Sequence, residues 1–117
     1  MTKFNNRPTE RDGIKFDSQA EARRYDELKL LEQAGEITDL VVHPRFELQP
    51  AFDRGGRRER AICYVADFQY NMEPGVTIVE DVKGGRATQT PVFKLKRKLW
   101  EYKHRDNGRI ALRVVER

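Results

Sequence analysis

Cysteine and long hydrophobic runs are both scarce in this sequence, and each absence excludes a class of protein. The single cysteine, Cys63, excludes an internal disulfide and a zinc site built from several cysteines, and its apolar surroundings, AICYVADF, predict a small core residue. No apolar stretch approaches the roughly 20 residues that span a bilayer. The start, MTKFNNRPTERDG, lacks the apolar segment of a signal peptide. We therefore expect a soluble cytoplasmic protein with no membrane partner.

Charge, by contrast, is abundant and unevenly distributed. Charged residues make up 36% of the sequence, and the formal net charge is +4. Residues 17–39 carry seven acidic and three basic side chains, whereas residues 86–105 carry seven Lys or Arg and one Glu. A second basic segment is DRGGRRER, at residues 53–60. This clustering favours a nucleic-acid partner, and the six Phe, four Tyr and one Trp favour a folded domain over disorder.

The order of predicted elements indicates a single α/β domain at residues 14–117, preceded by a flexible N-terminal arm at residues 1–13. Asp17 or Ser18 and then Thr90 are N-cap residues by type, and Gly35 suits the position after a helix. We expect helices at 17–34 and 90–104, strands at 45–49, 61–70, 76–83 and 109–115, extended pieces at 14–16 and 37–42, and a hairpin loop at 53–60. This αβββαβ order is typical of a mixed sheet flanked by helices.

Two aspartates lie on strands that are predicted to be neighbours. If Pro74 is at the centre of the intervening turn, residues equally far from it face each other, and Asp67 then faces Asp81. Two carboxylates in that position repel each other, and a divalent cation relieves the repulsion. Because Mg²⁺ prefers hard oxygen ligands, the pair predicts a metal site.

The strand that carries Asp81 offers further groups to such a site. Period two places Lys83 on the same face as Asp81, whereas Glu80 points to the opposite face and is a weaker candidate. The Lys83 ammonium can orient a water or neutralise charge on a phosphate, and as a neutral amine it can deprotonate that water. The Val82 carbonyl is a further candidate ligand. The alternative is a solvated pair of aspartates at a strand edge, with Lys83 as their ion-pair partner.

Glu21 is a candidate third carboxylate. On a helix it falls between Tyr25 and Leu28, on a stripe that also contains Leu31 and is expected to face the core. The spacing of Ser18 and Glu21 also fits a capping box, in which the carboxylate bonds back to the Ser18 N–H. Spacing alone leaves a metal ligand and a helix cap as near-equal alternatives.

The basic segments supply candidate phosphate contacts. The candidate nucleic-acid-binding residues are Arg54, Arg57, Arg58, Arg86, Lys94, Arg97 and Lys98. The residues of the second helix expected to make apolar contacts are Phe93, Leu95, Leu99, Trp100 and Tyr102. A charged surface helix with no partner is the alternative, and Gly84-Gly85-Arg86 matches a phosphate-binding loop only in part. We expect His43 and His104 to be surface or loop residues without metal-ligand neighbours.

Together these segments resemble the PD-(D/E)xK nuclease superfamily, and within it the small phage and prophage endonuclease-like proteins. The matching segments are FDSQAEARRYDEL around Glu21, YVADFQY around Asp67, EDVKG with Asp81 and Lys83, and TPVFKLKRKL. They extend over residues 15–115, and Ala66 stands where the proline that names the superfamily would be. The resemblance implies a restriction-endonuclease-like core and a bacterial host cell.

The resemblance also implies an activity, the hydrolysis of DNA phosphodiesters with Mg²⁺ or Mn²⁺ and no other cofactor. Asp67, Asp81 and Glu21 would then hold the metal, and Lys83 would be the catalytic lysine. Holliday-junction resolvases, restriction enzymes and transposon end-cutting endonucleases share this fold, so we expect branched or double-stranded DNA as substrate, and a homodimer would suit paired cuts. Two alternatives are a non-catalytic nucleic-acid-binding accessory protein of a packaging or recombination complex, and a basic domain that binds protein partners.

Overall fold

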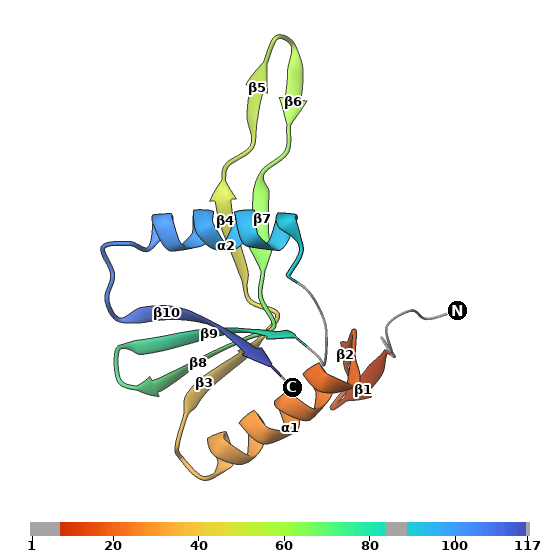
Figure 1. Cartoon of the computed structure of the whole chain (residues 1–117), viewed down its shortest axis with the longest axis vertical. Helices are drawn as coiled ribbons and strands as arrows, with labels where there is room; N and C mark the ends of the chain where they lie inside the picture. Colours follow the sequence, from red (N-terminus) through yellow and green to blue (C-terminus); the bar gives the residue numbers. More distant parts are fainter. Residues whose placement is uncertain (1–7, 84–88, 117) are drawn as a thin grey trace.

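The computed structural model describes residues 8–83 and 89–116 of the chain (Figure 1). The helices are α1 (Gln19–Gln33) and α2 (Pro91–Lys103). The strands are β1 (Thr9–Arg11), β2 (Ile14–Phe16), β3 (Thr38–Val42), β4 (Arg45–Gln49), β5 (Phe52–Arg54), β6 (Arg57–Glu59), β7 (Ile62–Val65), β8 (Phe68–Glu73), β9 (Val76–Lys83) and β10 (Ile110–Glu116). Both helices begin after predicted caps, because the Ser18 hydroxyl accepts from the Glu21 N–H and the Thr90 hydroxyl from the Phe93 N–H.

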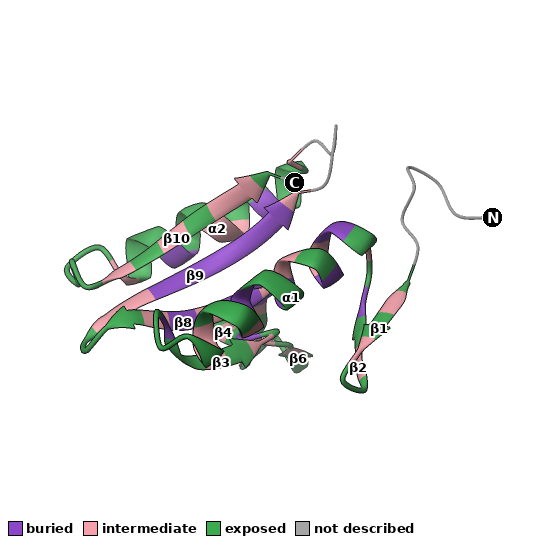
Figure 2. Ribbon diagram, turned by 90° about the horizontal axis from the view of Figure 1, so that it is seen from below, coloured by how far each residue is buried: buried purple, intermediate pink, exposed green. Residues whose placement is uncertain are grey.

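A four-stranded mixed sheet, in the strand order β10-β9-β8-β3, lies between the two helices. β9 is antiparallel to β8 and parallel to β10, and it is buried along most of its length (Figure 2). Along the chain, the helices and the strands of this sheet follow as α1, β3, β8, β9, α2 and β10. The predicted α/β fold with a mixed sheet flanked by helices is therefore confirmed.

The β8–β9 hairpin has the predicted register. Residues equally far from Pro74 are partners, such as Phe68 with Glu80 and Tyr70 with Ile78. The regular ladder ends at Asp67, whose N–H donates to the Glu80 carbonyl at 3.0 Å, one position out of register. Asp67 thus lies just before β8, beside the end of β9 that carries Asp81.

One predicted strand is wrong, because residues 61–70 form two strands that belong to different sheets. β7 pairs with β4, whereas β8 pairs with β3 and β9. The change of sheet falls at Ala66 and Asp67, where the Ala66 N–H donates to the Pro44 carbonyl (3.0 Å) and the His43 N–H to the Asp67 carbonyl (2.9 Å). β3 and β4 separate at the same level, so the sheet forks there. Residue alternation did not reveal the fork because it predicts which face a side chain occupies, not which strand is its neighbour.

β4 and β7 leave the fork as a two-stranded ribbon, and β5 and β6 extend it beyond α2 (Figure 1). We call residues 52–59 the hairpin arm. Its tip is Gly55-Gly56, with φ values of 58° and 77° that glycine adopts without steric cost. The predicted hairpin with its turn at the two glycines is therefore confirmed, but most of residues 53–60 form strand rather than loop.

The N-terminal segment contains more regular structure than predicted. Thr9–Arg11 forms β1 and pairs antiparallel with Ile14–Phe16, so the folded part begins before the predicted boundary at residue 14. The Arg11 guanidinium also bonds to Asp26 of α1 at 3.2 Å. Residues 1–7 of the predicted flexible arm lie outside the described residues.

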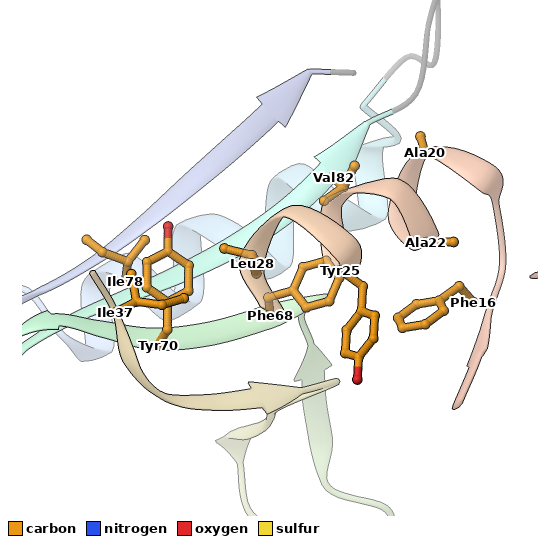
Figure 3. Close-up of a cluster of buried hydrophobic side chains, with 10 residues drawn as sticks. All are labelled: Phe16, Ala20, Ala22, Tyr25, Leu28, Ile37, Phe68, Tyr70, Ile78 and Val82. Atoms are coloured by element: carbon orange, nitrogen blue, oxygen red, sulfur yellow. The ribbon is translucent and has the colours of Figure 1, made fainter. Parts of the chain in front are cut away.

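A hydrophobic cluster lies on each face of the sheet. The cluster under α1 includes Phe16, Tyr25, Leu28, Phe68 and Val82 (Figure 3). The cluster under α2 contains Tyr64, Ala66, Val79, Phe93 and Trp100. Neither helix in the described part of the chain is long and apolar enough to cross a membrane.

The predicted packing of α2 is only partly correct. Phe93 and Trp100 are buried, but Leu95, Leu99 and Tyr102 are exposed by 58%, 40% and 65%. These three side chains lie on the side of the helix that faces away from the sheet. Likewise Leu31, predicted to lie on the core stripe of α1, is 37% exposed, while Tyr25 and Leu28 are buried.

Candidate active site

The fork in the sheet opens into a pocket of about 400 Å³. The start of α1, the end of β7, the Asp67 turn, the end of β9 and the start of α2 contribute to its lining. Every residue of the predicted metal and catalytic set lines this pocket: Glu21, Asp67, Asp81, Val82 and Lys83. Residues from α1, the turn before β8 and β9 thus meet at one place, although up to 62 positions separate them in sequence.

Asp67 is the most strongly perturbed carboxyl group in the pocket. Its Oδ2 accepts a hydrogen bond from the Val82 N–H at 2.6 Å. Burial raises the pKa of Asp67 to about 8, and the negative charges of Glu21 and Asp81 add to the rise. Within the described residues, no basic side chain forms an ion pair with Asp67. It is therefore a mostly buried acid without a counter-charge.

Asp81 has two partners, one at each of its carboxylate oxygens. The Tyr64 hydroxyl donates to Oδ2 at 2.6 Å, and the Lys83 ammonium lies 2.8 Å from Oδ1. Burial, followed by the hydrogen bond to Asp81, raises the pKa of the Tyr64 hydroxyl, so this group stays protonated and donates. The Lys83 Nζ also lies 4.0 Å from the centre of the Phe93 ring. The predicted placement of Lys83 beside Asp81 is confirmed.

Glu21 takes part in the helix cap and also lines the pocket, while its role as a metal ligand stays a prediction. Ser18 Oγ accepts from the Glu21 N–H at 3.2 Å and lies 3.4 Å from the Glu21 carboxylate, so the residue takes part in the helix cap. An oxygen of this carboxylate also lies within 4.8 Å of one of Asp67, and burial raises the pKa of Glu21 above its ordinary value. Being a cap residue therefore does not remove Glu21 from the pocket.

Glu80 lies on the opposite face of β9, as predicted, and has its own partners there. The Arg24 guanidinium donates to both of its carboxylate oxygens, at 2.8 and 2.6 Å, and the Tyr70 hydroxyl donates to Oε2. The side chain is 0% exposed. Arg24 neutralises its charge, and Glu80 does not line the pocket.

His43 has metal-ligand neighbours that were not expected from the sequence. One ring nitrogen of His43, one carboxylate oxygen of Glu21 and one of Asp67 all lie within 4.8 Å of one another. Sequence reasoning missed this group because its members are more than 20 positions apart. The same holds for Tyr64, although a tyrosine inside the apolar run AICYVADF does signal a hydroxyl that needs a buried partner.

Two of the three predicted carboxylates come close enough to share a divalent cation. Glu21 and Asp67 have carboxylate oxygens within 4.8 Å of each other, and carboxylate oxygens are the ligands that Mg²⁺ and Mn²⁺ accept, whereas Asp81 lines the same pocket but is not part of that group. The mutual repulsion that raises the pKa of Asp67 is the repulsion that a bound cation removes. The Val82 N–H donates to Asp67. The role of the Val82 carbonyl as a metal ligand stays a prediction.

The predicted nucleic-acid-binding arginines of the hairpin arm are exposed and lie outside the pocket. Arg54 and Arg57 are direct cross-strand partners beside the glycine tip. Arg57 lies 3.3 Å from Glu59, and Arg58 lies 3.2 Å from Asp53 across the ribbon. The arginines of this end of the ribbon are thus close to acidic neighbours as well as to each other, and their role in binding nucleic acid stays a prediction.

The predicted basic residues of α2 also lie outside the pocket lining. Lys94 and Lys98 are exposed, and Arg97 is half-buried beside Glu101. The basic residue of α2 that does line the pocket is Lys96, which sequence analysis did not single out. Arg86 lies outside the described residues.

The chain belongs to the family described as "Protein of unknown function (DUF1064)", whose model matches residues 1–116. No curated protein and no solved structure matches the chain. The comparisons therefore supply a family without an activity, and the function has to be argued from the pocket itself.

Proposed function

We propose that the chain is a divalent-metal-dependent DNA endonuclease whose active site is the pocket at the sheet fork. The observation that carries this proposal is Asp67, a mostly buried carboxyl group without a counter-charge, beside Glu21 and Asp81. A fold keeps such a group at a cost in stability, and perturbed acids in a pocket are typical of functional sites. The adjacent Lys83 amine provides the further group that phosphodiester hydrolysis uses.

Glu21, Asp67 and Asp81 would hold Mg²⁺ or Mn²⁺, with the Val82 carbonyl as a further candidate. When bound, the ion polarises the scissile phosphate and stabilises the leaving oxygen. The Lys83 ammonium donates to the attacking water or to a phosphate oxygen, and the Phe93 ring beside it limits its freedom of orientation. The Tyr64 hydroxyl and the Lys83 ammonium each take one lone pair of the Asp81 carboxylate, and each oxygen keeps a second lone pair for the ion.

DNA suits this site as a substrate because two elements near the pocket carry basic groups. Lys96 lines the pocket, and the hairpin arm presents Arg54 and Arg57 at its tip. Tyr64 follows Arg57 by seven positions along the ribbon, a reach of up to about 24 Å. At 3.4 Å per base pair this reach covers about seven base pairs of duplex. We therefore favour double-stranded or branched DNA, where a two-stranded ribbon has a groove to follow.

A cleavage assay on supercoiled plasmid and on a four-way junction tests the proposal, with Mg²⁺, with Mn²⁺ and with EDTA. We expect the wild type to cut with either metal and not in EDTA, and Asp81→Asn to lose at least about 100-fold in rate. Glu36→Gln is the matched control, because Glu36 is an exposed acid in the turn after α1 and should cut like the wild type. Equal cleavage by wild type and Asp81→Asn would contradict the proposal.

The exposed arginines of the hairpin arm also suit a second function, a nucleic-acid-binding accessory protein without catalysis. The same preparation distinguishes the two. Binding that falls steeply with salt, combined with no cleavage under every metal condition, favours the accessory protein. Absence of DNA affinity at every salt concentration leaves the basic domain that binds protein partners.

A further inference from the structure

His43 is placed beside the pocket by contacts that do not depend on its ring. It follows β3 at the fork, and its N–H donates to the carbonyl of Asp67 at 2.9 Å. Its φ of 56° is left-handed, a conformation that is uncommon outside glycine and in which histidine is one of the enriched residue types. The backbone therefore ties His43 to the same turn that holds the Asp67 carboxylate.

The ring of His43 then meets two of the pocket carboxylates. A ring nitrogen, an oxygen of Glu21 and an oxygen of Asp67 lie within 4.8 Å of one another. These three residues, all in the described part of the chain, form a group of His, Asp and Glu side chains whose ligand atoms are close enough to share one ion. Asp81 does not belong to this group, and its oxygens contact Tyr64 and Lys83. Asp67 thus has two kinds of neighbour, the like charge of Asp81 and a ring nitrogen of His43.

A nitrogen donor changes which metal such a group prefers. Mg²⁺ takes oxygen ligands and keeps several waters. Imidazole is a frequent ligand of first-row transition metals, whose affinities for nitrogen-containing sites rise along the series from Mn²⁺ to Cu²⁺. A site with one imidazole and two carboxylates therefore discriminates against Mg²⁺, whereas three carboxylates alone do not.

We propose that His43 is a metal ligand, and that Glu21, His43 and Asp67 form a site selective for a transition-metal ion such as Mn²⁺ or Co²⁺ over Mg²⁺. This assignment rests on the proposed function, because it names the metal class of the same pocket. The ring of His43 also lies 5.8 Å from that of Phe16, a contact that orients the imidazole without occupying its nitrogens.

Pulsed electron paramagnetic resonance of Mn²⁺ added to the full chain tests the assignment without any substrate. A directly bound imidazole modulates the Mn²⁺ spin echo at nitrogen frequencies, so the wild type should show this modulation. His43→Gly should lose it, and its Mn²⁺ affinity should fall by at least about tenfold while Mg²⁺ affinity changes far less. Glycine suits the left-handed backbone at this position, so the variant removes the ring without straining the fork.

The chain provides a matched control in its only other histidine. His104 caps α2, with Nδ1 2.8 Å from the Trp100 carbonyl and its ring stacked on Trp100, so His104→Gln should keep the nitrogen modulation. Labelling histidine with ¹⁵N in the wild type gives the same answer without a substitution, because the modulation must change with the isotope.

The outcomes separate this inference from the proposed function. Mn²⁺ bound in the wild type without nitrogen modulation, or with modulation that survives in His43→Gly, overturns the role of His43 and leaves the carboxylate site intact. Binding of Mg²⁺ without binding of Mn²⁺ by the wild type overturns the inference alone, and binding of neither ion overturns both. Modulation that disappears only in His43→Gly supports the assignment.

Discussion

The two faces of β9 bury carboxylates in opposite ways. On the face toward α1, Glu80 is fully buried, and Arg24 and Tyr70 satisfy both of its oxygens. At the fork, Asp67 is mostly buried and lies beside Glu21 and Asp81, so that burial first and their negative charges second raise its pKa to about 8. β9 therefore carries Glu80, whose charge Arg24 neutralises. It also borders Asp67, whose charge is repelled by its neighbours.

This difference is what the proposed function uses. A buried ion pair with satisfied hydrogen bonds maintains one packing of the two elements it joins, here α1 and β9. A group of like charges weakens the fold unless a cation binds, and perturbed acids of this kind are typical of functional sites. Changes on the two faces should accordingly have opposite effects on stability.

The largest effect is expected from Arg24→Met, which would leave Glu80 buried without a counter-charge. The free energy of unfolding should fall by about 3–5 kcal/mol, measured by urea denaturation near neutral pH. Arg23→Met is the matched control, since Arg23 is the exposed neighbour on the same helix and should change stability by no more than about 0.5 kcal/mol. Similar small losses in both variants would show that Glu80 is neutralised in some other way.

The next largest effect concerns pH. The pKa of Asp67 rises from its ordinary value of 3.8 to about 8, so the folded protein retains a proton that the unfolded chain releases. In EDTA, the free energy of unfolding should therefore fall as pH rises from about 4 to about 8, with a contribution of at most about 1.4 kcal/mol per pH unit from this group. The raised pKa of Glu21 acts in the same direction. Saturating Mn²⁺ should reduce the loss, and stability that rises with pH in EDTA would contradict the crowding.

A third prediction compares the same chemical change on the two faces. At about pH 8 in EDTA, Asp67→Asn should stabilise the protein by about 1 kcal/mol, because it removes a repelling charge and keeps an oxygen for the Val82 N–H. Glu80→Gln should destabilise it by about 2 kcal/mol, since it removes a charge that Arg24 needs. Calorimetric melting of both variants measures the signs, and a loss of stability in both would remove the distinction.

The smallest effect is expected from Lys83→Met. Lys83 is to Asp81 what Arg24 is to Glu80, but the side chain of Lys83 is 22% exposed and that of its partner 9%. Because water screens this partly exposed ion pair, the free energy of unfolding should fall by about 1 kcal/mol at most. Lys29→Met, which breaks the surface pair with Glu32, is the control for a lysine lost from α1. A loss as large as that of Arg24→Met would make Lys83 a structural residue.

Much of the fold could be predicted because local chemistry determines it. Caps at Ser18 and Thr90 and the paired glycines of the hairpin arm are local signals, and the structure confirms them. The fork was not predictable, because the run through Ala66 and Asp67 keeps the same alternation while its neighbours change. The exposure of Leu95 and Leu99 was missed for a related reason, since periodicity shows that residues share a face but not whether another element covers it.

The candidate site was predictable to the extent that its members share a strand or a hairpin. Asp81 and Lys83 follow from period two, and Asp67 follows from the turn at Pro74. His43 and Tyr64 reach the same place only because the chain passes through the fork twice, once after β3 and once after β7. Contacts of that kind depend on tertiary arrangement, which spacing does not encode.

The hairpin arm is attached to the rest of the molecule through β4 and β7 and forms a small sheet of its own. Residues inserted in pairs at its glycine tip would lengthen it and keep the alternation of every side chain below. Such an insertion would move Arg54 and Arg57 farther from the fork, while the groups at the fork would stay where they are.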